Sequence, residues 1–98
     1  MNTMEIREDL KQIKFYYSRK DLFAQSVAKI GQIGIQSKLD KYNSAICLAT
    51  PQMYELYYEI YVNSKTHEEY ADEYGYSVNY VYKLNHKLIQ YLKEKFSA

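Results

Sequence analysis

The last third of the chain divides into an acidic and a basic segment. Residues 66–75 contain four acidic side chains and no lysine or arginine, whereas residues 76–98 contain four lysines against one glutamate. The net charge of the whole chain is only +1, so the near-neutral total conceals one basic stretch. Contact with phosphate depends on the local field more than on total charge, and the basic segment is therefore the first candidate for chemistry.

Two side chains of the basic segment have types and spacing suited to hydrogen bonding with nucleotide bases. The amide of Asn79 can pair with adenine through two hydrogen bonds, and the amine of Lys83 can donate to O6 and N7 of guanine. The two residues are four positions apart, so a helix places both side chains on one face. The spacing predicts an exposed polar face, with His86 and Lys87 beside it.

No pattern for catalysis or metal binding accompanies these residues. The stretch HEEYA, residues 67–71, begins like HExxH but lacks the second histidine, which argues against a zinc hydrolase. His67 and His86 are far apart in the sequence with no cysteine near either, so neither is expected to bind a metal. No P-loop, G-x-S-x-G or GxGxxG sequence occurs. We therefore expect neither an enzyme nor a cofactor.

The cysteine content and the apolar runs indicate a cellular compartment. Cys47 is the only cysteine, which excludes an intrachain disulfide and favours a reducing environment. Within the run AICLA it is expected to be a small buried hydrophobe. The charged N-terminal stretch has no apolar signal-peptide core, and no apolar run approaches the ~20 residues of a membrane span. The sequence predicts a cytoplasmic protein with no membrane partner.

The elements that position the candidate residues are predicted to be helices. One proline and three glycines leave few places for tight turns, and the apolar fraction of 47% is typical of a globular domain. The predicted fold is all-α, a compact bundle of about five to six helices in a single domain. Residues 1–50 form its N-terminal helices, residues 51–63 a central core helix, and residues 66–96 a helix-turn-helix.

Three helices are expected in the N-terminal half. Thr3 is expected to cap the first, which ends near residue 17, and Ser18 to cap the second. Gly31 and Gly34 are expected to end the second helix, and the third runs from about residue 36 into Cys47. The inward residues of these helices follow steps of three and four and are Ile6, Leu10, Ile13, Tyr17, Leu22, Phe23, Val27, Ile30, Leu39, Tyr42, Ala45 and Ile46.

The fourth helix, PQMYELYYEIYVN, is predicted to be the centre of the core. Thr50 is its expected N-cap, and Pro51 occupies the first helical position, where the missing N–H costs nothing. The segment is apolar around most of its circumference, as is typical of a helix surrounded by others.

A helix, a tight turn and a longer helix are predicted after residue 65. Thr66 and Glu69 fit a capping box, Gly75 ends the first helix, and Ser77 caps the second. Ala71 lies four residues before Gly75 and is small where two helices approach closely, as in a helix-turn-helix. The inward residues are Tyr70, Ala71, Tyr74, Val81, Leu84, Leu88, Tyr91 and Leu92.

This segment, THEEYADEYGYSVNYVYKLNHKLIQYLKEKF, resembles the helix-turn-helix of sigma-factor region 4, which reads the promoter −35 element. Small phage regulators of Gram-positive bacteria, of the RinA and ArpU late-gene activator kind, are similar in build and size. The resemblance implies a regulator that binds double-stranded DNA and contacts RNA polymerase, and residues 1–50 share only size and helicity with these proteins. The matching positions are Thr66, Glu68, Glu69, Ala71, Gly75, Ser77, Val81 and Leu84.

The resemblance also implies which residues contact DNA. The base-reading positions of the family fall on Val78, Asn79, Tyr82 and Lys83, and the phosphate positions fall on Ser77, His86 and Lys87. Val78 stands where the family often has arginine, and no arginine follows Arg19. The fork-shaped donor favoured for guanine is therefore missing from this helix.

Two alternatives remain open from the sequence. The near-zero net charge and the thirteen tyrosines also fit a helical protein-interaction module without DNA readout, such as a phage assembly or packaging component or a host-directed inhibitor. A second apolar line through Tyr82, Ile89 and Phe96 indicates either that residues 1–50 cover the last helix or that it forms a dimer seam. A homodimer is favoured, because one short recognition helix with few cations binds weakly alone.

Overall fold

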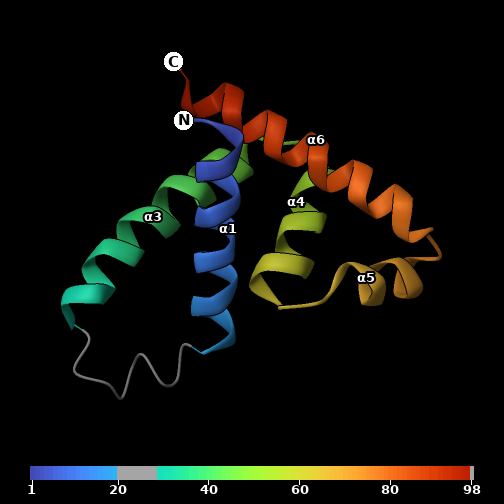
Figure 1. The fold of residues 1–98 in the computed structure, drawn as a ribbon, viewed down its shortest axis with the longest axis horizontal. Helices are drawn as coiled ribbons and strands as arrows, with labels where there is room; N and C mark the ends of the chain where they lie inside the picture. Colours follow the sequence, from blue (N-terminus) through green and yellow to red (C-terminus); the bar gives the residue numbers. More distant parts are fainter. Residues whose placement is uncertain (20–28, 98) are drawn as a thin grey trace.

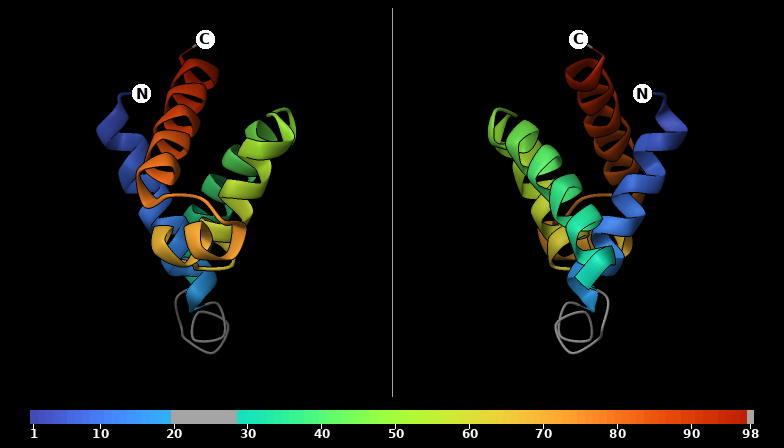
Figure 2. Two further views of the ribbon diagram at one scale, coloured as in Figure 1. Left: turned by 90° about the vertical axis from the view of Figure 1, so that its right-hand side faces the viewer. Right: turned by 90° about the vertical axis from the view of Figure 1, so that its left-hand side faces the viewer.

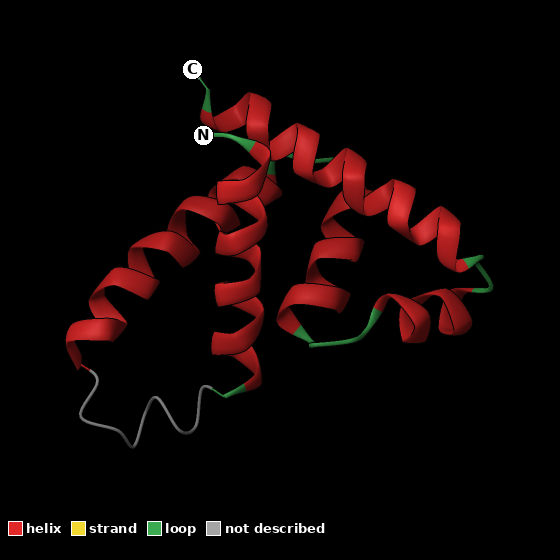
Figure 3. Cartoon of the chain, viewed as in Figure 1, coloured by secondary structure: helices red, strands yellow, loops and turns green. Residues whose placement is uncertain are grey.

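The structure is a computed structural model that describes residues 1–19 and 29–97. Its elements are α1 (Thr3–Ser18), α3 (Lys29–Cys47), α4 (Pro51–Tyr57), η1 (Tyr58–Val62), α5 (His67–Tyr74) and α6 (Val78–Phe96), where η1 is a π-helical continuation of α4. No strand occurs in the described ranges (Figure 3). The all-α fold predicted from the sequence is confirmed. No described helix combines the length and apolar character needed to cross a membrane.

The helices pack around α1 and the α4–η1 segment. Helix α1 contacts α3, η1 and α6, and α6 crosses the bundle while α5 packs against its first half (Figure 1). The two ends of the chain lie at the same end of the molecule (Figure 2). This arrangement supports one long side of α6 and leaves the other side to solvent.

One hydrophobic core holds the bundle together. Most of the described residues that were expected inside from the sequence are buried. Seven residues at the centre of the core are Leu56, Tyr57, Ile60, Ala71, Val81, Leu84 and Leu88. Complete burial of one large apolar side chain contributes about 1.5–3 kcal/mol. Repeated over these positions, that contribution is the main force that fixes α6 against α1 and α4.

Tyrosines supply much of this core because each joins an apolar ring to a polar tip. Tyr42 is buried and its hydroxyl donates to Asp9 Oδ2 at 2.7 Å, while the buried Tyr70 donates to Glu55 Oε1 at 2.9 Å. Burial raises the pKa of both phenols, which therefore stay protonated as donors. The unusual tyrosine content thus serves packing at these positions.

The α4–η1 segment is the centre of the bundle, as predicted. Thr50 caps it by accepting from Met53 N at 3.3 Å, with Pro51 in the first turn. The segment contacts α1, α3, α5 and α6. One side nevertheless faces solvent, since Tyr54 and Tyr58 are about half exposed and stack with ring centroids 5.9 Å apart.

The predicted start of the first helix is wrong by one residue. Asn2, not Thr3, is the N-cap, because its side chain accepts from Glu5 N at 2.8 Å while Glu5 accepts from Asn2 N at 3.3 Å. This reciprocal capping box needs an acid three residues after the cap, and only Asn2 has one. Ser18 is the last residue of α1, and its hydroxyl donates to Phe15 O. The second helix that it was predicted to cap lies outside the described residues.

The two glycines of GQIG do not end a helix. Helix α3 begins by Lys29 and continues through Gly31 and Gly34, so the third helix starts earlier than residue 36. A helix tolerates interior glycine at about 0.5–1 kcal/mol each, and the tertiary contacts of α3 outweigh that cost. The predicted apolar stripe through Leu22, Phe23 and Val27 lies outside the described residues.

Two residues predicted to be buried are exposed. Cys47 is the last residue of α3, and its side chain is exposed beside Tyr54. Tyr74, at the end of α5, is 39% exposed and packs against the rings of Tyr70 and Tyr76. Both residues lie in the last turn of their helices.

The second apolar line of α6 is covered from within the chain. Ile89 is buried, Phe96 packs edge-on against Tyr42 with ring centroids 4.9 Å apart, and the hydroxyl of Tyr91 donates to Ala45 O at 2.7 Å. Helices α1 and α3 therefore clasp the C-terminal half of α6, which accounts for Ile89 and Phe96 without a dimer seam. The homodimer stays a prediction.

Candidate nucleic-acid interface

Local sequence signals fix the ends of α5. Thr66 Oγ1 accepts from Glu69 N at 3.0 Å, and Glu69 Oε1 accepts from Thr66 N at 2.9 Å, so the predicted capping box is present. These hydrogen bonds lower the pKa of the Glu69 carboxyl and keep it charged near the positive end of the helix dipole. The acids of the first turn therefore have a structural role.

The turn between α5 and α6 depends on Gly75. Its φ of 71° and ψ of 25° are left-handed, and the next N–H, of Tyr76, donates to Ala71 O at 2.8 Å. Ser77 then caps α6 by accepting from Tyr80 N at 3.1 Å. A short helix, a tight turn and a longer helix occur here as predicted, and residues 75–77 form the turn.

Helix α6 has one buried and one exposed side. The buried residues are Val81, Leu84, Asn85, Leu88, Ile89 and Leu92. Asn79, Lys83, His86 and Lys87 are all exposed and follow one another at steps of four, three and one, so they share the opposite face. We call these four residues the polar face of α6. The structure thus brings together four of the seven residues predicted to contact DNA.

The other three predicted residues lie differently. Ser77 is exposed but its hydroxyl oxygen caps the helix, and Val78 is half buried against the core. Tyr82 is 50% exposed, and its ring stacks on the imidazole of His67 with centroids 4.8 Å apart. The Tyr82 hydroxyl lies 3.5 Å from Glu68 Oε1, so this side chain leans toward α5 and away from the polar face.

The charge around α6 is uneven. Lys93 and Lys95 lie in its last turn, where cations suit the negative end of the helix dipole, so they have a structural explanation. Lys83 and Lys87 lie earlier in α6, where the helix dipole does not explain a cation. On α5 the carboxylates are exposed, and among the described residues only that of Glu73 forms an ion pair, with Lys65. A phosphate backbone would therefore be attracted by the polar face and repelled by the exposed side of α5.

The sequence reasoning missed a polar residue on the buried side of α6. Asn85 is 7% exposed and its Oδ1 accepts from the hydroxyl of Tyr61. Burial raises the pKa of Tyr61 to about 12, which keeps the donor protonated. Its position in the sequence could have predicted this burial, because Asn85 lies four residues from both Val81 and Ile89 in an otherwise apolar stripe.

An aromatic cluster at the turn was also missed. Tyr70, Tyr74, Tyr76 and Tyr80 follow one another in ring contact, and Gln52 Nε2 donates to the hydroxyl of Tyr80 at 3.2 Å. The cluster ties the turn to α4 and so fixes the angle at which α6 leaves it. In the sequence these tyrosines form one i, i+4 pair on each side of Gly75.

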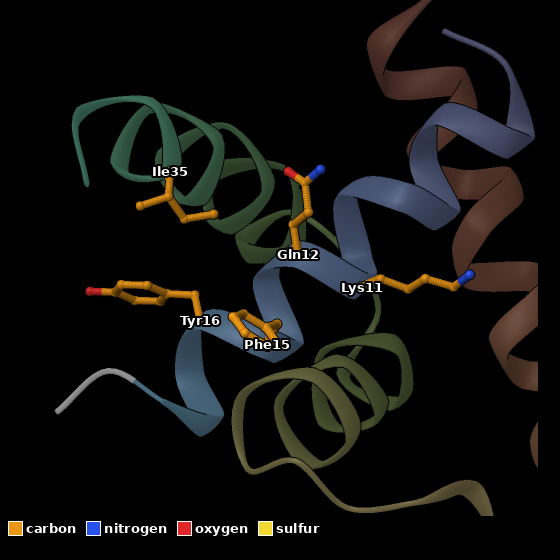
Figure 4. A pocket seen from close by; sticks show the side chains of 5 residues that line it. All are labelled: Lys11, Gln12, Phe15, Tyr16 and Ile35. Carbon is orange, nitrogen blue, oxygen red and sulfur yellow. The ribbon is translucent and has the colours of Figure 1, made fainter. Parts of the chain in front are cut away.

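Two further features bear on function without adding to the interface. An apolar hollow of about 390 Å³ lies between α1 and α3, lined by Gln12, Phe15, Tyr16 and Ile35, with Lys11 at its edge (Figure 4). Within residues 1–19 and 29–97 no group of histidine, cysteine, aspartate or glutamate side chains could hold a metal ion.

Comparison with known protein families, curated proteins and solved structures found no match to this chain. The likeness to sigma-factor region 4 therefore rests on the residues quoted from the sequence.

Proposed function

We propose that the protein is a sequence-specific DNA-binding regulator of transcription that inserts α6 into the major groove. The observation that carries this proposal is the polar face of α6, which is exposed immediately after a capped, glycine-containing turn. Residues near the N-terminal end of such a helix meet base edges. Asn79 and Lys83 lie there and have the hydrogen-bonding groups for adenine and guanine.

The roles within the polar face follow from position along α6. Asn79 and Lys83, in the first two turns, read bases, whereas His86 and Lys87, one turn further, contact phosphate. Val78 adds apolar contact at the edge of the same end. Tyr82 joins them only if its ring leaves His67, so we assign it a supporting role.

The weak positive charge has a consequence for affinity. Two cations on the polar face provide little of the sequence-independent attraction that dominates non-specific binding. The exposed carboxylates of α5 reduce it further. Useful affinity then requires two half-sites, and we propose that a homodimer supplies them, with RNA polymerase as a further protein partner. The sigma-like pattern of residues 66–96 also favours a phage regulator of the RinA and ArpU kind.

A gel-shift titration with promoter duplexes at two salt concentrations tests the proposal. Binding that weakens steeply as salt increases supports phosphate contact, since each phosphate neutralised contributes a slope of about −0.9 to log K against log salt. Absence of binding at the lower salt concentration contradicts the proposal.

A protein-interaction module is the second candidate, and a different surface favours it. The stacked pair of Tyr54 and Tyr58 is half exposed next to Glu55 and Glu59, and exposed carboxylates continue along α5. Exposed tyrosine is enriched where proteins meet. If duplex DNA fails to bind, this aromatic and acidic surface is the next site to test by substitution.

A further inference from the structure

A second hollow lies between α1, η1, the start of α5 and the middle of α6. Its volume is about 320 Å³, at the lower end of the range for pockets that bind small molecules. The residues that line it are Arg7, Leu10, Lys11, Lys14, Ile60, Tyr61, His67, Asn85 and Ile89. We call it the α1–α6 cavity. It is separate from the polar face, which none of these residues belongs to.

The ionisable side chains that line this cavity, apart from His67 and Tyr61, are three cations. Arg7, Lys11 and Lys14 follow the three- and four-residue spacing of one face of α1, and no carboxylate lines the cavity. Arg7 forms no ion pair with any residue that the structure describes. Among the described residues, Lys11 forms an ion pair only with the exposed Glu8 at 3.5 Å, and surface pairs of this kind contribute little to stability.

The third cation, Lys14, already contacts other parts of the protein. Lys14 Nζ donates to Lys65 O at 3.0 Å, and burial lowers the pKa of its amine against the opposing effect of Glu69 and Glu68. These two carboxylates would disfavour an anion close to Lys14. A bound negative group is therefore best placed toward Arg7 and Lys11. Figure 4 shows Lys11 extending away from Ile35 and the hollow on that side.

The cavity also presents an unsatisfied polar atom and an apolar floor. Nε2 of His67 is enclosed and has no hydrogen-bond partner among the described residues. Burial lowers the pKa of this imidazole, so the ring is neutral near pH 7 and offers a donor or an acceptor. Buried polar atoms are normally satisfied, and one that lines a cavity invites a ligand group. Leu10, Ile60 and Ile89 lie at the bottom of the cavity and are each exposed by 1% or less.

We propose that the α1–α6 cavity binds a small organic anion with a flat apolar body and a carboxylate or phosphate group. The body lies against Leu10 and Ile89, and the anionic group is held by Arg7 and Lys11. The guanidinium can bind a carboxylate or phosphate with two parallel hydrogen bonds. Because His67 begins α5 and Asn85 lies on α6, such a ligand stabilises the packing of the helix-turn-helix on α1.

The proposal does not depend on DNA binding and is tested with the protein alone. The probe is 1-naphthyl phosphate, titrated into the full chain while methyl NMR signals are recorded. Saturable shifts at the methyls of Leu10, Ile60 and Ile89 are expected, with Ile35 unaffected. Shifts confined to Ile35 place the probe in the hollow between α1 and α3 and contradict the proposal, as does the absence of any saturable shift.

Two partial probes separate charge from apolar contact. Inorganic phosphate has only the charged group of the probe, and 1-naphthol has only its aromatic body. Each should therefore bind at least tenfold more weakly than 1-naphthyl phosphate, a difference in binding free energy of about 1.4 kcal/mol. If either half binds as tightly as 1-naphthyl phosphate, the combined recognition is wrong.

A matched pair of variants assigns the charge. Arg7→Gln should weaken binding of 1-naphthyl phosphate about tenfold, because it removes a charge-assisted contact. Lys95→Gln makes the same change in net charge at the far end of α6 and should leave binding unchanged. Equal weakening by both variants would show a general charge effect and overturn the site. Thermal melts of both proteins confirm that the comparison is made on folded chains.

Discussion

Two glycines of this chain should respond in opposite directions to the same substitution. At both Gly75 and Gly34 an added Cβ would meet no atom within 4 Å, so steric collision decides neither case. The two glycines differ in backbone conformation. Gly75 has a φ of 71°, whereas Gly34 lies inside helix α3. Backbone conformation alone should therefore set the sign of each effect.

The magnitudes follow from those conformations. An alanine in the left-handed region costs roughly 1–2 kcal/mol, partly offset by about 0.4–1 kcal/mol from the reduced freedom of the unfolded chain. Gly75→Ala should thus lower the free energy of unfolding by about 1 kcal/mol, which for a domain of this size reduces Tm by about 4–8 °C. Gly34→Ala should raise the free energy of unfolding by about 0.5–1 kcal/mol.

Urea unfolding followed by circular dichroism at the helix signal measures both effects. An unchanged dependence on urea concentration would show that each variant unfolds between the same two states as the parent. Gly75→Asn serves as a further control and should lose less than Gly75→Ala, because asparagine enters the left-handed region more easily. If Gly75→Ala is as stable as the parent, or Gly34→Ala loses as much as Gly75→Ala, the turn between α5 and α6 is described wrongly.

Three further substitutions test the packing of the helix-turn-helix. Ala71→Leu should cost about 1–3 kcal/mol by overpacking a buried position beside α6, and a melt like that of the parent would contradict the predicted register. Ser77→Ala removes the cap of α6 and should cost about 1 kcal/mol in urea unfolding; no loss would mean that the cap does not stabilise α6. Burial lowers the folded-state pKa of His67, so the unfolded chain binds its proton more readily and stability falls as pH drops below about 6.5. In His67→Gln the loss of Tm between about pH 7 and pH 5 should be smaller, and an equal loss would show that this imidazole is not responsible.

The parts of the fold that local chemistry determines were predictable from the sequence. Thr50, Thr66, Gly75 and Ser77 act through hydrogen bonds or dihedral angles within a few residues, and all four take their predicted positions. The apolar spacing of α6 likewise predicted which side is buried, because a helix fixes the relation between sequence and face.

The features that depend on packing between distant segments were not predictable from the sequence. Gly34 was expected to end a helix on its intrinsic preference, yet α3 continues through it. The exposure of Cys47 depends on where α3 ends against α4, which no short-range signal gives. The covering of Phe96 by Tyr42 joins residues far apart in the sequence, so the sequence left open whether residues 1–50 or a dimer seam covers the apolar line.

For the candidate site, the sequence predicted seven residues, and the structure places four of them together on one exposed face. Exposure of Asn79, Lys83, His86 and Lys87 follows from the helical register alone. The stacking of Tyr82 on His67 does not, because it requires the angle between α5 and α6.

The central claim is that the polar face of α6 reads DNA sequence, and one binding measurement tests it most directly. Duplexes that the parent protein enriches from a random pool are compared with scrambled duplexes by fluorescence anisotropy. Asn79→Ala and Lys83→Ala should each lose about 1–3 kcal/mol on the selected duplex and almost nothing on the scrambled one. Lys87→Ala should weaken both duplexes alike, and Lys95→Ala should change neither. If the parent enriches no duplex, or if Asn79→Ala and Lys83→Ala bind the selected duplex as the parent does, α6 does not read DNA.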